Sequence, residues 1–189
     1  MATTALFVEI LVIGATAEIW MTLLLMLFLN TSEINSIIGV LTTNNGMIAL
    51  SATLFIAVTY NIGWVINFVA ERLIKPYFQK SIRDEIFDGS SQSYSMAKYH
   101  ILLNASQDLI NEIVFDRHII RIARANVLNF LLIAITVAFN FNKYAKAVTV
   151  YIIIVSLVIA VLSFFQWKTR YRAHYEKIQV IANKIKLQD

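Results

Sequence analysis

The sequence contains no cysteine, which excludes disulfide bonds, thiolate metal ligands and cysteine nucleophiles. Proline occurs once and glycine five times in 189 residues, and this scarcity argues against a loop-rich or disordered chain. Charged residues are also few, at 15%, against about 25% in soluble globular proteins. Apolar residues take their place and make up 58% of the chain. This composition is typical of an integral membrane protein.

Four apolar runs approach or exceed the length needed to cross a bilayer. A hydrocarbon core about 30 Å thick requires roughly 20 residues of α-helix. The runs cover residues 5–29, 47–70, 126–141 and 147–166, the third being the shortest. In lipid every backbone polar group must be satisfied internally, so even the β-branched fourth run is expected to be helical. We therefore predict an all-α integral membrane protein with four transmembrane helices and long cytoplasmic helical extensions.

Basic residues are unevenly distributed among the segments that connect these runs. Of the 16 lysines and arginines, eight lie between the second and third runs and six follow the fourth. The connection between the first and second runs has none, and the connection between the third and fourth has only Lys143 and Lys146. Because cytoplasmic segments carry the excess of Lys and Arg, residues 73–125 and 167–189 are predicted to be cytoplasmic. An even number of spans then places both termini in the cytoplasm.

These boundaries divide the chain into four parts. They are a first transmembrane hairpin at 1–72, a cytoplasmic helical region at 73–125, a second hairpin at 126–166, and an amphipathic tail helix at 167–189. A long helix is predicted to begin at about Tyr94 and to continue into the third span, because no Gly or Pro interrupts it. An apolar stripe marks the tail: Tyr171, His174, Tyr175, Ile178, Ile181, Ala182 and Ile185. Such a stripe needs a packing partner, which we expect within the same chain, with a neighbouring subunit as the alternative.

Glu18 lies near the middle of the first run, where an ionised carboxylate is costly. Small and polar residues occupy its helical neighbours at i−4, i−3 and i+4, namely Gly14, Ala15 and Thr22. One hypothesis places Glu18 in a pore or intramembrane polar site, together with Asn61 of the second run. The alternative is a neutral Glu18 hydrogen-bonded to Asn61 or Thr59. Glu9 lies about 180° away around the same helix and is expected at the cytoplasmic interface.

Thr149, Ser156 and Ser163 recur every seven residues in the fourth run. A row of small hydroxyl residues is typical of a packing seam between helices in lipid. Their hydroxyls commonly bond backbone carbonyls, so we favour helix association over a permeation path for this row.

Arg117, Arg121 and Arg124 share one helix face immediately before the third run. Arginine binds planar anions through paired hydrogen bonds, so this face is a candidate site for an anionic lipid headgroup or a nucleotide, with Arg83 as a further ligand. The alternative partners are nearby acids, namely Asp108, Glu112 and Asp116. Lipid phosphate combined with local ion pairs is the favoured interpretation.

The sequence lacks recognisable catalytic motifs. Its three histidines, His100, His118 and His174, are not spaced as metal ligands. It has no glycine-rich phosphate loop, no G-x-S-x-G and no H-E-x-x-H. We therefore predict no enzymatic activity, no cofactor and no metal.

The segment VEILVIG at 8–14, followed by Trp20, and the pattern Arg117-x-x-x-Arg121-x-x-Arg124 entering a span resemble small bacterial four-helix membrane proteins of antiviral defence systems. In such systems an oligomer perforates or depolarises the inner membrane. The resemblance implies a multi-pass protein of the bacterial inner membrane. The sequence departs from the Arg–His spacing of related defence ribonucleases, because only three residues separate Arg170 from His174.

We therefore expect a homo-oligomeric channel or pore in the lipid bilayer, gated through its cytoplasmic region by a nucleotide, nucleic-acid or protein trigger. The alternative is a non-conducting scaffold or accessory subunit that anchors a cytoplasmic partner at the membrane. A proton-coupled transporter is disfavoured, because four spans without a detectable inverted repeat would need to dimerise.

Overall fold

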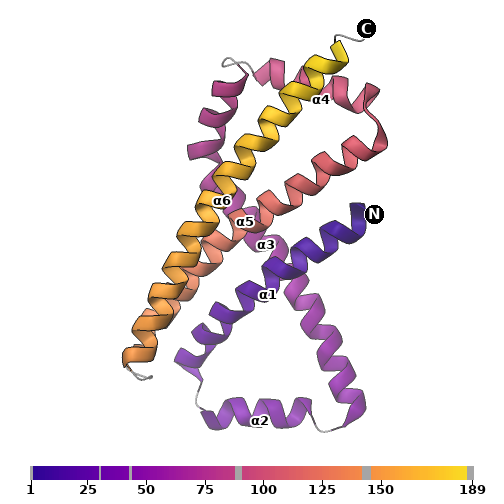
Figure 1. Cartoon of the computed structure of the whole chain (residues 1–189). Coiled ribbons are helices and arrows are strands. Elements are labelled where there is room, and N and C mark those ends of the chain that lie inside the picture. The colour runs from indigo at the N-terminus through magenta and orange to yellow at the C-terminus, as the bar shows by residue number, and fades with distance from the viewer. Residues whose placement is uncertain (1, 30, 43, 88–90, 142–145, 187–189) are drawn as a thin grey trace.

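The computed structural model describes residues 2–29, 31–42, 44–87, 91–141 and 146–186 (Figure 1). Within these residues the regular structure is entirely helical: α1 (Ala2–Phe28), α2 (Thr31–Leu41), α3 (Asn45–Ile86), α4 (Ser91–Asn104), α5 (Gln107–Phe139) and α6 (Lys146–Lys186). Four of these helices, α1, α3, α5 and α6, are long and apolar enough to cross a membrane. The all-helical fold and the four apolar helices are as predicted.

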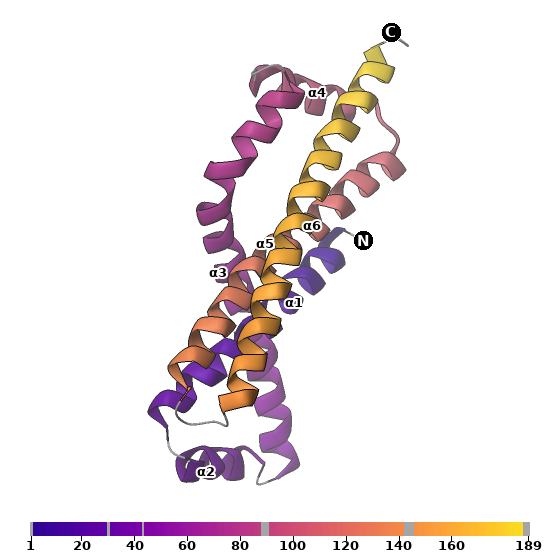
Figure 2. The ribbon, with the colours of Figure 1, turned by 60° about the vertical axis from the view of Figure 1, so that its left-hand side comes forward.

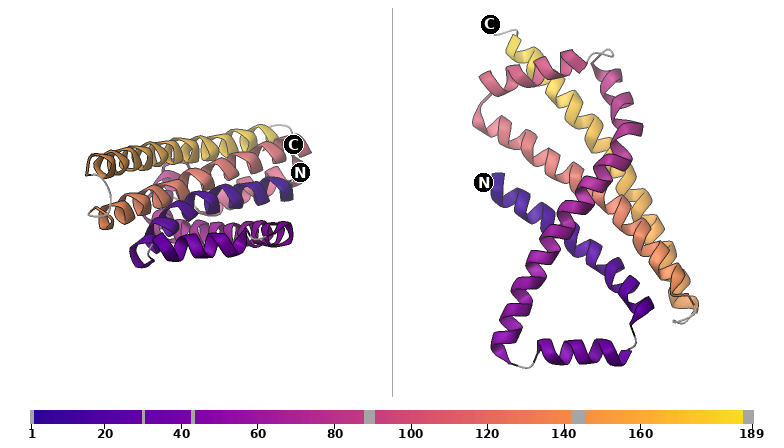
Figure 3. Two further views of the ribbon diagram at one scale, coloured as in Figure 1. Left: turned by 90° about the horizontal axis from the view of Figure 1, so that it is seen from below. Right: turned by 180° about the vertical axis from the view of Figure 1, so that it is seen from behind.

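The helices form successive layers. Seen from below, α1 lies between the α5–α6 pair and α3 (Figure 3, left). Figure 1 shows α1 and α3 crossing, with α2 joining their lower ends, while α5 and α6 run side by side. The end of α5 and the start of α6 lie at the same end of the molecule as α2. Helix α4 and the C-terminal part of α6 lie at the opposite end (Figure 2).

The backbones of α1 and α3 touch where the two helices cross (Figure 3, right). A Cβ atom built on Gly14 would lie 1.8 Å from the Thr59 carbonyl oxygen, and one on Gly63 would lie 2.0 Å from the Ile10 carbonyl oxygen. Small residues permit such a close approach, which lets dispersion forces act between whole backbones. The crossing therefore depends on glycine at both positions.

The α5–α6 contact contains the hydroxyl row of the fourth run. Thr149, Ser156 and Ser163 are all buried, and Ala160 and Trp167 continue the same buried face toward the far end of α6. Because α6 packs most extensively on α5, this face is the seam between the two helices. The predicted packing role of the row is confirmed.

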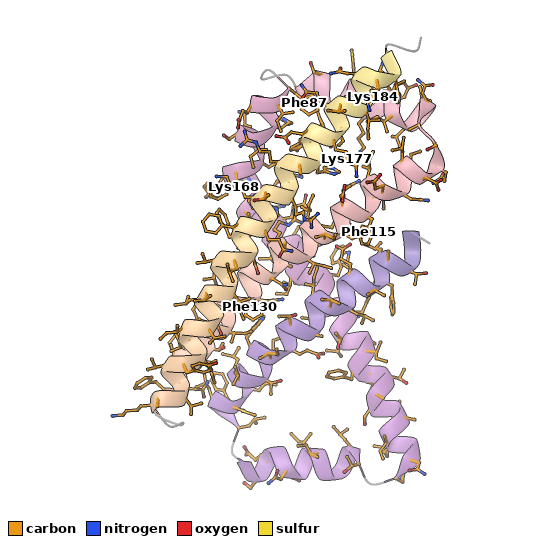
Figure 4. All side chains as sticks on the ribbon, in the orientation of Figure 1. Phe87, Phe115, Phe130, Lys168, Lys177 and Lys184 are labelled. Carbon is orange, nitrogen blue, oxygen red and sulfur yellow. The ribbon has the colours of Figure 1, made fainter. Side chains whose placement is uncertain are left out.

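The tail of α6 packs within the chain, as expected. Its buried residues join α3 and α4 in one apolar cluster composed of Ile82, Phe87, Ala97, Ile101, Tyr175, Ile178 and Ala182. Aromatic rings reinforce the cluster, since the Tyr94 ring centroid lies 5.4 Å from that of Phe87 and 5.1 Å from that of Tyr175. Figure 4 labels Phe87 at this end of the molecule. The predicted tail and the fourth run form one continuous helix.

The prediction of one uninterrupted helix from about Tyr94 into the third run is wrong. Helix α4 ends at Asn104 and α5 begins at Gln107, so the chain turns at residues 105–106. Ser106 is the N-cap of α5, and its side chain accepts a hydrogen bond from the Leu109 N–H at 3.4 Å. Serine is among the best N-cap residues, so a helix can start here without Gly or Pro. The structure also places a helix, α2, in the connection between the first two runs.

Substitution of either crossing glycine by alanine is expected to destabilise the fold. Gly14→Ala and Gly63→Ala should each lower the free energy of unfolding in detergent by about 1–3 kcal/mol, because the helices must separate to admit a methyl group. Gly39→Ala in α2 is the matched control, since a Cβ there meets nothing within 4 Å. Equal stabilities of all three variants would show that the crossing is not a close backbone contact.

Candidate functional site

Glu18 on α1 faces α3, and one of its carboxyl oxygens lies within hydrogen-bonding distance of the Thr59 hydroxyl, whose single proton is also within reach of the Phe55 carbonyl at 2.8 Å. This is the contact anticipated by the alternative hypothesis for Glu18. Among the described residues no hydrogen bond reaches its second carboxylate oxygen, and the side chain is only half-buried. Thr59 therefore satisfies part of the hydrogen-bonding capacity of this carboxyl group.

An open groove of about 530 Å³ borders Glu18. Four helices line it, through Ala15, Glu18, Ile19, Thr22, Leu23, Phe55, Ile133, Val137 and Ile152. Glu18 is the one ionisable residue in this lining, which is otherwise almost entirely apolar. The Glu18 carboxyl group thus borders an apolar groove.

The structure brings together most of the residues predicted around Glu18. Ala15 and Thr22 line the same groove, and Gly14 is buried at the nearby helix crossing. Asn61 is separate from this group, because its side chain is exposed and donates to the Ala57 carbonyl of its own helix at 2.7 Å.

Two buried asparagines, Asn129 of α5 and its C-cap Asn140, hold the backbone of α1. Asn129 donates to the Ile13 carbonyl at 3.0 Å and accepts from the Trp20 indole at 3.2 Å. Asn140 donates to the Leu23 carbonyl at 3.1 Å. These contacts advance in the same direction along both helices, so α1 and α5 run parallel.

A buried polar cluster, which the sequence alone did not reveal, connects the first turns of α1 to α5. The Glu9 side chain is 1% exposed, contacts the His118 imidazole, and lies 3.4 Å from an Arg121 guanidinium nitrogen. His118 and Arg121 precede the third run, so Glu9 lies at the level where that run begins. The sequence displays the charged side chains of this cluster. It does not show that they meet, because residues 109 positions apart have no local spacing from which a contact can be predicted.

The three predicted arginines line one cavity of about 250 Å³, called here the basic cavity. Helices α3, α4, α5 and α6 surround it, through Glu71, Lys75, Gln79, Tyr94, Arg117, Ile120, Arg121, Arg124, Tyr171, His174 and Tyr175. Arg83 does not line the basic cavity, and its guanidinium pairs with the adjacent Asp84 at 2.9 Å. The structure therefore separates Arg83 from the other three arginines.

Carboxylates neutralise only part of the charge in the basic cavity. Glu71 pairs with Lys75 at 2.7 Å and lies 3.4 Å from Arg124, which also donates to Asn67 at 3.0 Å. For Arg117 no hydrogen bond or ion pair is found within the described part of the chain. The lining thus contains four permanent cations and one carboxylate.

Two of the three acids proposed as local partners of the arginines, Glu112 and Asp116, pair with a lysine instead. Lys177 on α6, labelled in Figure 4, binds Glu112 at 2.7 Å and Asp116 at 2.9 Å. These ion pairs join α5 to the tail of α6 and draw two of the nearby carboxylates away from the basic cavity. The arginines consequently keep an excess of positive charge.

Neutral polar groups complete the lining. Burial, with the neighbouring Arg117 guanidinium as the second cause, lowers the pKa of the His174 imidazole to about 4, so this ring is neutral at pH 7. Its Nδ1 atom and the Nε atom of Arg124 are buried and have no hydrogen-bond partner among the described residues. The Tyr171 and Tyr175 hydroxyls lie 2.8 Å apart. The basic cavity therefore holds unused hydrogen-bonding capacity beside its cations.

Comparison with protein-family models, curated proteins and solved structures gives no match to this chain. Among the described residues, no group of three or more His, Asp or Glu side chains is arranged to hold a metal ion. The groove at Glu18 and the basic cavity are therefore the two candidate functional sites of this chain.

The Asn129 contact to α1 can be tested with a neighbouring residue as the control. Asn129→Leu should lower the free energy of unfolding in detergent by about 1 kcal/mol, because it removes an interhelical hydrogen bond and leaves the Trp20 indole unpaired. Asn126→Leu, three residues earlier, should have a smaller effect, since the Asn126 side-chain oxygen already lacks a partner. If thermal or chemical unfolding shows the reverse order, the asparagine does not hold α1 in this way.

Proposed function

We propose that this chain is a multi-pass membrane protein that assembles with copies of itself into a channel or pore. Its four long apolar helices support membrane insertion. The uneven distribution of basic residues supports a topology with both termini and residues 73–125 in the cytoplasm. The helical arrangement is compatible with this topology, because α2, which lies in the connection without basic residues, shares one end of the molecule with the end of α5 and the start of α6.

The groove at Glu18 carries the proposal of assembly. In a monomer this carboxyl group would face lipid, where a charged side chain costs about 3 kcal/mol even on insertion-based scales. Thr59 provides a partner for only one of its oxygens. A second copy that covers the groove would remove Glu18 from lipid and place it between subunits or beside a water-filled path.

The outer half of α3 supports the same assembly. Residues 52–58 are exposed on every face of the helix, although they belong to the second apolar run. Phe55 from this segment also lines the groove at Glu18. An unpacked helix next to an open groove provides two adjoining surfaces for a neighbouring subunit.

The resemblance to membrane-perforating effectors of antiviral defence suggests a role for such an assembly. Opening of the channel would depolarise the membrane after a cytoplasmic trigger. The non-conducting scaffold is the competing function, and conductance distinguishes the two.

Planar-bilayer recording of the purified oligomer tests conduction. We expect a cation-preferring current, because acidic side chains along a pore favour cations. Glu18→Lys should shift the reversal potential under a salt gradient toward anion preference. Glu33→Lys in α2 introduces the same charge change outside the four apolar runs and should leave selectivity near that of the wild type. An oligomer without current would favour the scaffold, and unchanged selectivity in Glu18→Lys would remove Glu18 from the pore.

The sequence contains no cysteine, so a single introduced cysteine is the only thiol that can be labelled. Its labelling therefore reports on which side of the membrane that position lies. Thr42→Cys, after α2, should react with a membrane-impermeant maleimide added to intact spheroplasts. Asn104→Cys, at the end of α4, should react only in inverted vesicles. Both side chains are exposed, so accessibility within the fold does not bias the comparison. Labelling from the same side would contradict the proposed topology.

A further inference from the structure

We propose that the basic cavity binds the phosphate group of a small phosphate ester. The cavity carries an excess of positive charge, since four cations and one carboxylate line a space that four helices enclose. Arginine is suited to phosphate because its planar guanidinium donates two parallel hydrogen bonds. Arg117, Arg121 and Arg124 come from successive turns of α5 and can approach one tetrahedral anion from the same side.

Several polar groups in the lining of the cavity also lack hydrogen-bond partners among the described residues. Arg117 has no hydrogen-bond or ion-pair partner in the described part of the chain, and Arg124 keeps a buried Nε without one. The buried His174 also has an unpartnered Nδ1. Buried polar groups are rarely left unsatisfied in native proteins, because each one costs about 1–3 kcal/mol. An anion with several acceptor oxygens would accept from the buried Arg124 Nε and from the unpaired Arg117 guanidinium, and from His174 Nδ1 in the tautomer that carries the proton there.

The size of the basic cavity limits the ligand. Its volume of about 250 Å³ is smaller than the roughly 300–1,000 Å³ typical of sites for drug-sized molecules. A phosphate group with a small substituent fits this volume, whereas the remainder of a larger ligand must extend outside it.

A neighbouring apolar pocket shows where such a substituent can extend. This pocket, of about 70 Å³, shares Tyr94, Arg117 and His174 with the basic cavity. Its remaining lining includes Ile101, Ile110, Ile113, Val114 and Ile178, from α4, α5 and α6. These residues lie on the side away from the apolar runs. The acyl chains of a lipid would extend toward the runs instead, so the geometry favours a water-soluble phosphate ester over a lipid headgroup.

Arg121 connects the basic cavity to the membrane helices. It lines the cavity and also lies 3.4 Å from Glu9 of α1. A bound phosphate and the Glu9 carboxylate would compete for this guanidinium, so ligand binding would weaken the link between α1 and α5. Regulation of current by this competition rests on the proposed channel function, whereas phosphate binding does not.

Thermal unfolding in phosphatidylcholine nanodiscs tests binding without reference to conduction. Inorganic phosphate should raise the unfolding midpoint in a saturable way, and sodium chloride at equal ionic strength should not. Arg117→Gln should weaken the apparent affinity roughly tenfold or more, as loss of a hydrogen bond to a charged group implies. This variant should fold normally, because Arg117 is exposed and has no partner to lose. Arg83→Gln is the control, since it removes the same charge outside the basic cavity and should bind phosphate like the wild type.

A second set of nanodiscs, in which phosphatidate replaces part of the phosphatidylcholine, identifies the source of the phosphate. If the ligand is a water-soluble phosphate ester, inorganic phosphate should raise the unfolding midpoint equally in both lipid compositions. A raised midpoint and a lost phosphate response, both absent in Arg117→Gln, would assign the site to a lipid headgroup. The proposal is overturned if chloride and phosphate act alike and Arg117→Gln matches Arg83→Gln with both lipid compositions. These results are independent of current, so failure of binding and failure of the channel proposal can be told apart.

Discussion

The fold depends on how closely other helices approach the backbone of α1. On one side Gly63 of α3 lies against the Ile10 carbonyl, and on the other the Asn129 and Asn140 amides bind the Ile13 and Leu23 carbonyls. Contacts to backbone atoms restrain both the rotation and the axial position of a helix. In lipid such contacts matter more than apolar burial, because lipid tails are as apolar as leucine.

The restrained rotation of α1 separates its two acids. Glu9 is buried against His118 on α5, whereas Glu18 meets Thr59 on α3 and opens onto the groove. A rotation of about 180°, the angle between residues nine positions apart, would exchange the positions of Glu9 and Glu18 around the helix. The same small-residue crossing that permits close packing therefore also determines which carboxyl group is buried and which one borders the groove.

Features determined by local composition were predictable from the sequence. The four apolar helices follow from the length of the apolar runs, and the shared face of the three arginines follows from their spacing along one helix. Contacts between distant segments were not predictable in this way. The Glu9–His118 contact spans 109 residues and depends on α1 and α5 running parallel. The break at Ser106 was missed because a serine N-cap ends a helical pattern without a Gly or Pro. Arg83 pairs with Asp84, a neighbour whose opposite charge is visible in the sequence.

The basic cavity and the groove at Glu18 lie at different levels of one structure. The cavity is formed where α3, α4, α5 and α6 meet, and the groove lies farther along α1. Helix α1 belongs to both regions, since Glu9 contacts Arg121 of the cavity and Glu18 borders the groove. One helix thus links the basic cavity to the groove at Glu18.

Helix α6 adds a mechanical property to this arrangement. Its 41 residues form an uninterrupted rod about 60 Å long, roughly twice the thickness of a bilayer core. About half of that length projects beyond its apolar run and carries the residues that pack on α3 and α4. A tilt of only about 10° within the bilayer would move the far tip sideways by roughly 5 Å, because displacement grows with the length of a lever. Small changes in the tilt of α6 would therefore be amplified at the opposite end of the molecule.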